Sequence, residues 1–235
     1  MLNYFSQLMD WILPVTCVFC GQKTLSSQPN ICSACVADLP WIKHACLRCG
    51  LPLPEEGFIC GICLKRPPPY SRLQALFHYQ FPVDQLILRL KFHQQLIYAQ
   101  LLGHLLAERC RRYYTTVANP PAMLIPVPLH PKRLRQRGFN QAVELAKPLS
   151  HALKIPIGYG IVKRIKFTQA QMDLPLNERA HNVKDAFSIH SKLPSHVAII
   201  DDVVTTGHTI KALCKILRAA GVKQIDVWCV ARTSL

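Results

Sequence analysis

The sequence has few acidic residues and no long apolar run. Its 235 residues include 13 Asp and Glu against 28 Lys and Arg, which gives a formal net charge of +15. No run approaches the roughly 18 consecutive apolar residues of a membrane-spanning helix. Residues 1–17 lack the basic start of a secretory signal peptide and carry Asp10 within their apolar stretch. We therefore expect a soluble, cytoplasmic protein without a membrane span, whose first residues form a short amphipathic helix.

Positive charge is concentrated in the C-terminal half. Beyond residue 120 the sequence has 17 Lys and Arg against 7 Asp and Glu, with the densest group in HPKRLRQRGFNQ. This basic group consists of Lys132, Arg133, Arg135 and Arg137. Such an excess favours phosphate-bearing partners, either nucleotides or nucleic acid. Composition leaves open the alternative of a solvated surface that aids solubility.

Cysteine usage divides the chain. Eight of the 11 cysteines form four C-x-x-C pairs: Cys17/Cys20, Cys32/Cys35, Cys46/Cys49 and Cys60/Cys63. In a C-x-x-C turn both thiolates face one metal ion, and two such turns complete a tetrahedral zinc site. CVFCGQKTLSSQPNICSAC and CLRCGLPLPEEGFICGIC repeat one pattern: C-x-x-C-G, a turn-rich connector, then C-x-x-C. Gly21 and Gly50 follow the first pair of each copy, where a turn often needs a positive φ angle.

The duplication predicts two structural zinc ions, one for each copy. The ligands are expected to be Cys17, Cys20, Cys32 and Cys35 for the first ion, and Cys46, Cys49, Cys60 and Cys63 for the second. A crossed pairing, of the first pair with the third, stays open. Disulfides are disfavoured because a chain without a secretory signal is expected in a reducing compartment. An iron–sulfur cluster suits evenly repeated pairs less well. The remaining cysteines, Cys110, Cys214 and Cys229, lie in apolar patterns and are expected in the core.

Beyond a proline-rich segment at 64–70, the apolar pattern alternates between strand and helix. We expect strands at 73–81, 122–129, 197–202 and 224–233. We expect helices at 82–114 (as one or two), 139–153 and 206–221, the last ended by Gly221. The alternation predicts an α/β fold with a mainly parallel sheet flanked by helices, which binds ligands at the carboxyl ends of its strands. The expected domains are a double zinc-ribbon module at 1–66 and an α/β domain at 71–235.

The stretch VAIIDDVVTTGHT, residues 197–209, joins an acidic pair to a turn suited to an anion. Asp201 and Asp202 follow a buried strand, and residues 205–209 surround the start of the next helix. Free backbone N–H groups and the helix dipole favour a phosphate there, whereas the carboxylates favour hydroxyls or a divalent cation. A sugar with cis hydroxyls and a 5′-phosphate meets both demands. Helix capping by Thr206 or Thr209 is the alternative, but it explains neither the acid pair nor Gly207.

This stretch resembles the 13-residue motif with which type I phosphoribosyltransferases bind phosphoribosyl pyrophosphate (PRPP): four hydrophobic residues, two acids, two variable residues and T-T-G-x-T. With the doubled cysteine pattern, IPVPLHPKRLRQRGFNQA and TQAQMDLPLNERAHNVKDAF, the chain is similar to the ComF/GntX family over most of residues 15–235. The resemblance implies a type I phosphoribosyltransferase-like fold that binds PRPP or a nucleotide phosphate with Mg²⁺. Asp201 and Asp202 would contact the ribose hydroxyls. The 5′-phosphate would be contacted by Thr205, Thr206, Gly207, His208 and Thr209.

The resemblance also places two further loops. The segment around His130 to Arg133, which includes Lys132, takes the position of the pyrophosphate loop, with Arg137 just beyond it. Residues 166–183 take the position of the loop that covers the active site. Gln171, Arg179 and Asn182 of that loop either serve the site or order the loop. For Lys91 we expect a solvated helix surface, with only a hint of anion contact.

Members of the ComF/GntX family are associated with natural competence, the uptake of DNA as a single strand. The resemblance implies a competence protein that handles incoming single-stranded DNA, with DNA-uptake proteins such as a helicase or a recombination mediator as partners. The alternative is an active phosphoribosyltransferase that joins PRPP to an unidentified base. These enzymes recognise the base through a hood, and the sequence offers none after its last strand. Whether the chain is an enzyme stays open.

Overall fold

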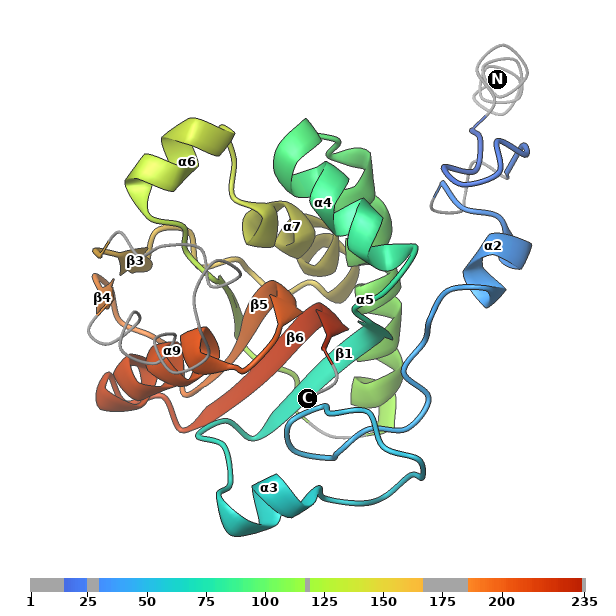
Figure 1. Ribbon diagram of the computed structural model, residues 1–235. Coiled ribbons are helices and arrows are strands. Elements are labelled where there is room, and N and C mark those ends of the chain that lie inside the picture. Colours follow the sequence, from blue (N-terminus) through green and yellow to red (C-terminus); the bar gives the residue numbers. More distant parts are fainter. Residues whose placement is uncertain (1–14, 25–29, 117–118, 167–185, 234–235) are drawn as a thin grey trace, which may run out of the picture. The chain divides into compact units, whose positions relative to one another are not determined.

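The computed structural model describes residues 15–24, 30–116, 119–166 and 186–233 (Figure 1). The chain forms two compact units, Met1–Pro40 and Trp41–Leu235. The first four cysteines of the duplicated pattern belong to the first unit, and the second four belong to the unit that contains the sheet. The expected domain boundary at 66–71 stays a prediction. The amphipathic helix expected at the N-terminus lies outside the described residues.

A four-stranded parallel sheet forms the centre of the second unit. Its strands lie in the order β1 (Arg72–His78), β6 (Gln224–Arg232), β5 (His196–Val204) and β2 (Met123–Pro126). Apolar runs with little alternation occupy β5 and β6, as expected for strands that are covered on both faces. The predicted α/β fold is confirmed. Strand β5 continues two residues beyond Asp202, so the acidic pair lies within the last residues of the strand and not after it.

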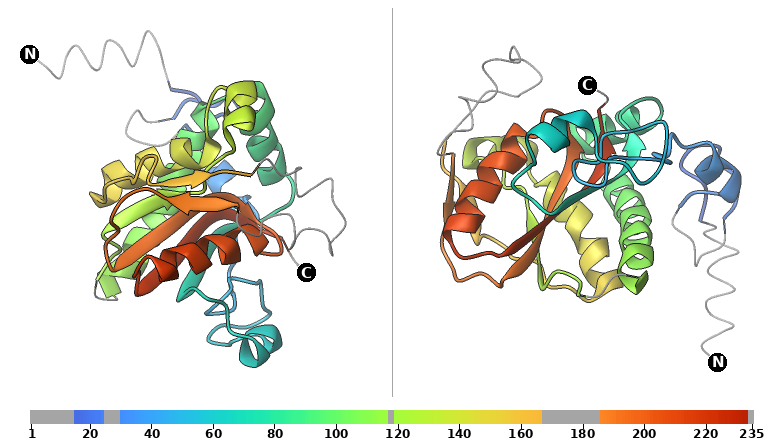
Figure 2. Two further views of the ribbon diagram at one scale, coloured as in Figure 1. Left: turned by 90° about the vertical axis from the view of Figure 1, so that its left-hand side faces the viewer. Right: turned by 90° about the horizontal axis from the view of Figure 1, so that it is seen from below.

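Helices cover both faces of the sheet. Helices α5 (Ile97–Thr116) and α7 (Gln141–Leu153) pack on one face, and α9 (His208–Ala219) lies on the opposite face (Figure 2). Helix α9 contributes Ile210, Leu213, Cys214 and Leu217 to the core beneath it. Helices α5 and α7 approach closely at Gly103, where a Cβ atom would lie 2.3 Å from Pro148 Cγ. As predicted, Cys110, Cys214 and Cys229 are fully buried.

The predicted helical region 82–114 forms two helices, α4 (Val83–His93) and α5, separated at Gln94, whose φ is 55°. Helix α9 begins at His208, two residues later than expected. Its last residue is Ala219, and its C-cap residue is Ala220. Gly221, which was expected to end the helix, follows with φ of 89°. None of the helices within the described ranges has the length and apolar character needed to cross a membrane.

Beyond the cysteine repeats, three short elements in the described part of the chain were not predicted. Helix α6 (Pro131–Arg137) follows β2, and β3 (Val162–Arg164) pairs antiparallel with β4 (Phe187–Ile189). The N-cap residue of α6 is His130, whose side chain accepts a hydrogen bond from the Lys132 N–H, and the C-cap residue is Gly138 with φ of 82°. None of its residues is buried, so it carries no apolar stripe for a periodicity analysis to detect.

The two cysteine repeats fold alike. Gly21 N–H bonds to Cys17 O in the first repeat, and Gly50 N–H bonds to Cys46 O in the second. Both glycines have positive φ angles, 72° and 63°, as predicted. In each repeat a short helix follows the third cysteine: α2 (Ser33–Ala37) and α3 (Gly61–Lys65). The duplication seen in the sequence is therefore also a duplication of structure.

The second repeat lines the edge of the sheet. Ile42 N–H bonds to Leu76 O and Leu73 N–H bonds to Arg48 O, each at 2.8 Å, so the repeat runs alongside β1. Trp41 packs on Phe77 with 4.5 Å between ring centroids. The edge of β1 is thus covered and not open to another chain.

Candidate functional site

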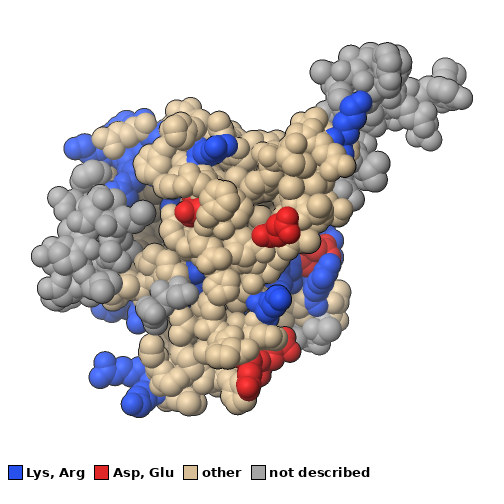
Figure 3. Space-filling view, turned by 45° about the vertical axis from the view of Figure 1, so that its right-hand side comes forward, with Lys and Arg blue, Asp and Glu red and all other residues tan. Residues whose placement is uncertain are grey.

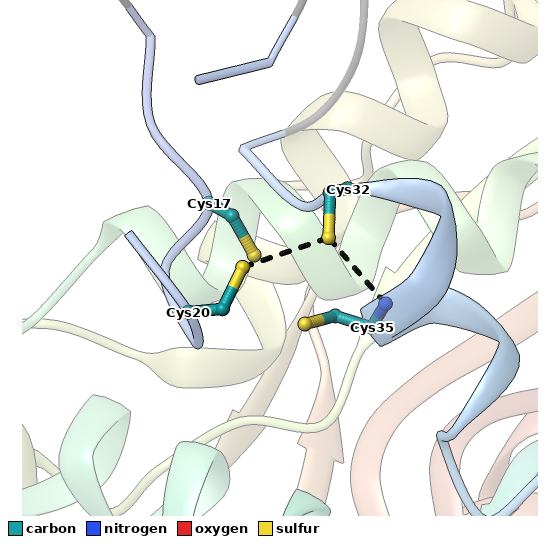
Figure 4. Close-up of side chains that lie close together, drawn as sticks. All are labelled: Cys17, Cys20, Cys32 and Cys35. Carbon is teal, nitrogen blue, oxygen red and sulfur yellow. Dashed lines mark hydrogen bonds between the residues drawn. The ribbon is translucent and has the colours of Figure 1, made fainter. Parts of the chain in front are cut away.

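The eight paired cysteines form two separate groups. In each group the four sulfur atoms lie within 4.8 Å of one another. One group is Cys17, Cys20, Cys32 and Cys35, which converge in Figure 4, and the other is Cys46, Cys49, Cys60 and Cys63. The sequential pairing is therefore the one that the structure adopts, and the crossed alternative is wrong.

Sulfur spacing matches a zinc site. Cys20 Sγ lies 3.7 Å from Cys32 Sγ, and Cys49 Sγ lies 3.7 Å from Cys60 Sγ. Four sulfurs placed at about 2.3 Å around a tetrahedral zinc ion lie about 3.8 Å apart. A disulfide requires about 2.05 Å, which these pairs exceed by far. Each group therefore fits one structural zinc ion.

Backbone N–H groups prepare the first cysteine of each group for metal binding. Burial raises the pKa of Cys17, but N–H groups of Cys20 and Cys32 outweigh this effect and lower the pKa to about 6. Cys46 responds in the same way to N–H groups of Cys49 and Cys60, and its pKa falls to about 7. Thiolates are the form that binds zinc, so these N–H groups favour the binding form of the first cysteine. The second group also shows the opposite effect, because burial and the neighbouring cysteines raise the pKa of Cys49 and Cys63.

The second candidate site lies where β5 leads into α9. Thr205, Thr206 and Gly207 connect the two elements, and Gly207 is the N-cap residue with φ of 75°. Because glycine has no side chain, the helix receives no side-chain cap from this residue. Thr206 Oγ1 lies 2.8 Å from His208 Nδ1. Helix capping by Thr206 or Thr209 therefore does not explain the motif, and the start of α9 is suited to an anion.

The two acids of the motif differ in environment. Asp202 is 4% exposed, whereas Asp201 is half-buried. Burial and the neighbouring Asp202 carboxylate raise the pKa of Asp201 above its usual value, although Lys91 acts in the opposite direction. Two adjacent carboxylates in this position favour a cation or a hydroxyl donor beside them.

Lys91 supplies such a cation. Its Nζ lies 2.9 Å from Asp202 Oδ2, and its side chain is only 16% exposed. The expectation of a solvated Lys91 was wrong. Helix α4 alone looks amphipathic, and only its packing over the carboxyl ends of the strands brings this lysine to Asp202. No spacing signal in the sequence connects positions 91 and 202.

Arginines from two further elements interact electrostatically with the acidic pair. Arg137 of α6 donates a hydrogen bond to Gln141 Oε1 at 2.6 Å, and its guanidinium lies 5.7 Å from the centre of the Phe92 ring. Burial lowers the pKa of Arg137, and the negative charge of Asp202 opposes this effect. Burial and the charge of Arg133 lower the pKa of Arg164 to about 10, which Asp201 opposes. Arg164 is 8% exposed. These guanidiniums remain charged at neutral pH, so the site presents positive charge around two carboxylates.

The remaining predicted residues divide between the site and the surface. Arg133 and Arg137 are half-buried, and Asp202 interacts electrostatically with Arg137, whereas Lys132 and Arg135 are exposed on α6. His208, predicted to contact the 5′-phosphate, is half-buried, and its Nδ1 lies beside Thr206 Oγ1. Gln171, Arg179 and Asn182 lie outside the described residues, and so does nearly all of the predicted covering loop at 166–183.

Arg232, at the end of β6, joins the phosphate loop to the second cysteine group. It is 5% exposed and donates to the carbonyl oxygens of Val204, at 2.9 Å, and Thr205. Its Nε donates to Cys49 O at 3.4 Å. The sequence analysis did not single out this residue, because a lone arginine in a strand pattern carries no motif.

Comparisons with known proteins agree with this architecture. Residues 8–64 match the double zinc ribbon domain, and residues 140–234 match the phosphoribosyl transferase domain. Competence protein F of Haemophilus influenzae is 35% identical over 99% of this chain and 100% of its own length.

The chain belongs to the ComF/GntX family.

Another relative is the DNA utilization protein YhgH of Salmonella typhi, 33% identical over 94% of this chain and 98% of its own. Among solved structures, a purine phosphoribosyltransferase from Pyrococcus horikoshii is 25% identical and covers 56% of this chain and 70% of its own, with a TM-score of 0.33. In ComF/GntX terms, the two cysteine groups are the two ribbons of the double zinc ribbon. The β5–α9 turn lies in the phosphoribosyltransferase-type domain.

Proposed function

We propose that the β5–α9 site binds PRPP or a related ribose 5-phosphate together with Mg²⁺. One observation carries the proposal: Asp201 and Asp202 lie near the carboxyl end of a central parallel strand, directly before a helix whose N-cap is Gly207. Ligands of parallel α/β sheets bind at this end of the strands. The backbone N–H groups at the start of α9 favour a phosphate, and the carboxylates favour ribose hydroxyls and a divalent cation.

Each surrounding group then has a task in binding. Asp201 and Asp202 accept hydrogen bonds from the two ribose hydroxyls. Thr205, Thr206, Gly207, His208 and Thr209 hold the 5′-phosphate. Arg133 and Arg137, with Lys132 at the start of α6, face the pyrophosphate. Lys91 neutralises Asp202 when no ligand is bound, because a buried carboxylate needs a charged partner.

Titration calorimetry tests this proposal. We expect PRPP to bind the wild type more tightly with Mg²⁺ than without it. The raised pKa of Asp201 leaves part of this carboxyl protonated at neutral pH, and Mg²⁺ favours its ionised form. The gain in affinity from Mg²⁺ should therefore grow as the pH rises.

The double variant Asp201→Ala/Asp202→Ala removes hydrogen bonds to charged groups, each of which contributes about 1.5–3 kcal/mol, so affinity should fall more than tenfold. Glu55→Ala/Glu56→Ala removes the same charge from exposed positions and serves as the control. Absence of PRPP binding by the wild type, or equal affinity in both double variants, would contradict the assignment.

We further propose that the protein acts in natural competence and handles incoming single-stranded DNA. Full-length similarity to competence protein F supports the process, and the excess of basic residues beyond residue 120 supports contact with DNA phosphates. In this role the phosphoribosyltransferase-type domain recognises phosphate, and proteins of DNA uptake, such as a helicase or a recombination mediator, are its partners.

An active phosphoribosyltransferase is the second candidate, because the motif retains both acids and the phosphate loop. This candidate predicts release of pyrophosphate from PRPP when the correct base is supplied, with loss of turnover in Asp201→Ala. A screen of bases with a pyrophosphate-coupled assay distinguishes the two functions.

A further inference from the structure

An open cleft lies between the second ribbon and the sheet, within the compact unit Trp41–Leu235. Its volume is about 680 Å³, within the roughly 300–1,000 Å³ range of ligand sites. One wall is formed by ribbon residues between Lys43 and Gly57, and the other by the start of β1 and the last turns of α5. The cleft thus exists because the ribbon runs along the edge of β1 without filling the space beside α5.

This cleft is distant from the ribose-phosphate site. Arg72, in the cleft, aligns with Asp226 on β6, and Asp226 aligns with Ala198 on β5. Asp202 lies four residues beyond Ala198, which is about 13 Å along the strand at roughly 3.3 Å per residue. Two strand spacings separate β1 from β5 in addition. A ligand in the cleft and a ligand at the β5–α9 turn therefore have room to bind together.

The charge of the cleft favours an anion. Four of its lining residues are basic: Lys43, Arg72, Arg109 and Arg112. Glu56 is the one acid among the lining residues, and it lies 3.6 Å from His44. On the face shown in Figure 3, basic side chains form separate small groups and not one continuous surface.

The cleft also offers a planar surface that is held in place from within. The Arg72 guanidinium lies 4.4 Å from the centre of the Tyr113 ring. Tyr113 meets Tyr114 edge to face at 4.9 Å, and the Tyr114 hydroxyl donates to Asp226 at 2.5 Å. His196 Nε2 lies 3.0 Å from the same carboxylate oxygen. Bases of single strands stack on aromatic rings and on guanidinium planes, and a stack fixed in advance loses little entropy on binding.

We propose that this cleft binds single-stranded nucleic acid, with Lys43, Arg109 and Arg112 on the phosphates and the Arg72–Tyr113 stack beside a base. The inference rests on the proposed role in DNA handling and adds a site to it. The nucleic acid binds beside the amino-terminal half of β1, and PRPP binds independently at the carboxyl end of β5.

Fluorescence anisotropy with a labelled deoxythymidine oligonucleotide, measured over a range of salt concentrations, tests the proposal. The cleft variant carries Lys43→Gln, Arg109→Gln and Arg112→Gln, all at exposed positions. The control variant carries Arg111→Gln, Lys147→Gln and Lys215→Gln, which remove the same charge outside the cleft. Each phosphate that a basic side chain neutralises adds about 0.7 to the logarithmic salt slope on a single strand, so the slope of the cleft variant should be smaller by about 2. The control should keep the wild-type slope.

PRPP binding separates this inference from the proposed function. We expect the cleft variant to bind PRPP as the wild type does, and saturating PRPP with Mg²⁺ to leave the oligonucleotide bound. If the wild type binds no oligonucleotide, the role in DNA handling fails and the inference fails with it. If the wild type binds but the cleft variant keeps its slope, or if PRPP displaces the oligonucleotide, only the inference is wrong. If the cleft variant loses binding of polyglutamate but keeps binding of the oligonucleotide, the ligand of the cleft is an acidic protein and the nucleic-acid proposal is wrong.

Discussion

Gly21 and Gly50 show how one residue type at equivalent positions meets different demands. Both follow the first C-x-x-C of a ribbon and both have positive φ. Among the described residues, and leaving aside its chain neighbours, no atom lies within 4 Å of a Cβ built on Gly21. A Cβ on Gly50 would lie 2.5 Å from Leu73 Cδ2 and 3.0 Å from Leu73 O. Gly50 therefore serves both the turn and the close approach of the ribbon to β1.

This difference predicts unequal costs of substitution. Gly21→Ala should lower the free energy of unfolding only by the cost of placing an L-residue in the left-handed conformation, about 1–2 kcal/mol. Gly50→Ala should add the cost of overpacking against the backbone of β1, about 1–3 kcal/mol more. Thermal unfolding of the two variants beside the wild type measures both effects. A melting temperature of Gly50→Ala equal to or above that of Gly21→Ala would show that the ribbon moves away from β1 without cost.

At the scale of elements, the two ribbons share a fold but not their surroundings. Cys17 is buried and Cys20 is exposed in the first group, whereas three of the four cysteines in the second group are buried. The second ribbon also hydrogen bonds to β1 and receives Arg232 at Cys49 O. Zinc in the second ribbon therefore supports the sheet unit, and zinc in the first ribbon supports its own unit.

Single substitutions of ligands test this division. Cys17→Ser and Cys46→Ser should each reduce zinc from two ions per chain to one, as measured by elemental analysis. Only Cys46→Ser should lower the melting temperature of the sheet unit, by about 2–4 °C for each kcal/mol of destabilisation. It should also weaken PRPP binding, because Arg232 then no longer bonds to an ordered ribbon. Equal effects of both substitutions on the sheet unit, or iron in place of zinc, would refute this description.

At the scale of the whole molecule, the basic residues serve more than one surface. Arg133 and Arg137 of α6 are half-buried, and Asp202 interacts electrostatically with Arg137, whereas Lys132 and Arg135 are exposed. The densest basic group of the sequence is thus divided between the ribose-phosphate site and the protein surface. Arg135, which has no part in the proposed PRPP site, is placed to contact DNA phosphates while PRPP is bound.

Two single variants test the role of α6. Arg135→Gln should lower the salt slope of oligonucleotide binding by about 0.7, which is the contribution of one neutralised phosphate. This variant should impair transformation while PRPP affinity and zinc content stay unchanged. Arg137→Gln removes the same charge and should weaken PRPP binding instead. Identical behaviour of the two variants would mean that α6 acts as one surface, and an unchanged slope in both would leave DNA binding to other residues.

The sequence by itself determined the features that depend on short spacing. Two cysteines separated by two residues form a turn that faces one metal ion, and the repeat of the pattern predicted two such sites. Four apolar residues followed by Asp201, Asp202 and the T-T-G-x-T turn specify a buried strand, its carboxyl end and a helix start. Each of these features lies within a few residues of chain, so local geometry decides it.

Tertiary structure alone decided which distant residues meet. Lys91 reaches Asp202 only because α4 packs over the carboxyl ends of the strands, and Arg232 links Thr205 to Cys49 only because β6 lies beside β5. The cleft between Lys43 and Arg109 needs the second ribbon to run along β1. Hydrophobic periodicity records which face of an element is buried but not which neighbour covers it, so these contacts follow from packing and leave no pattern in the sequence.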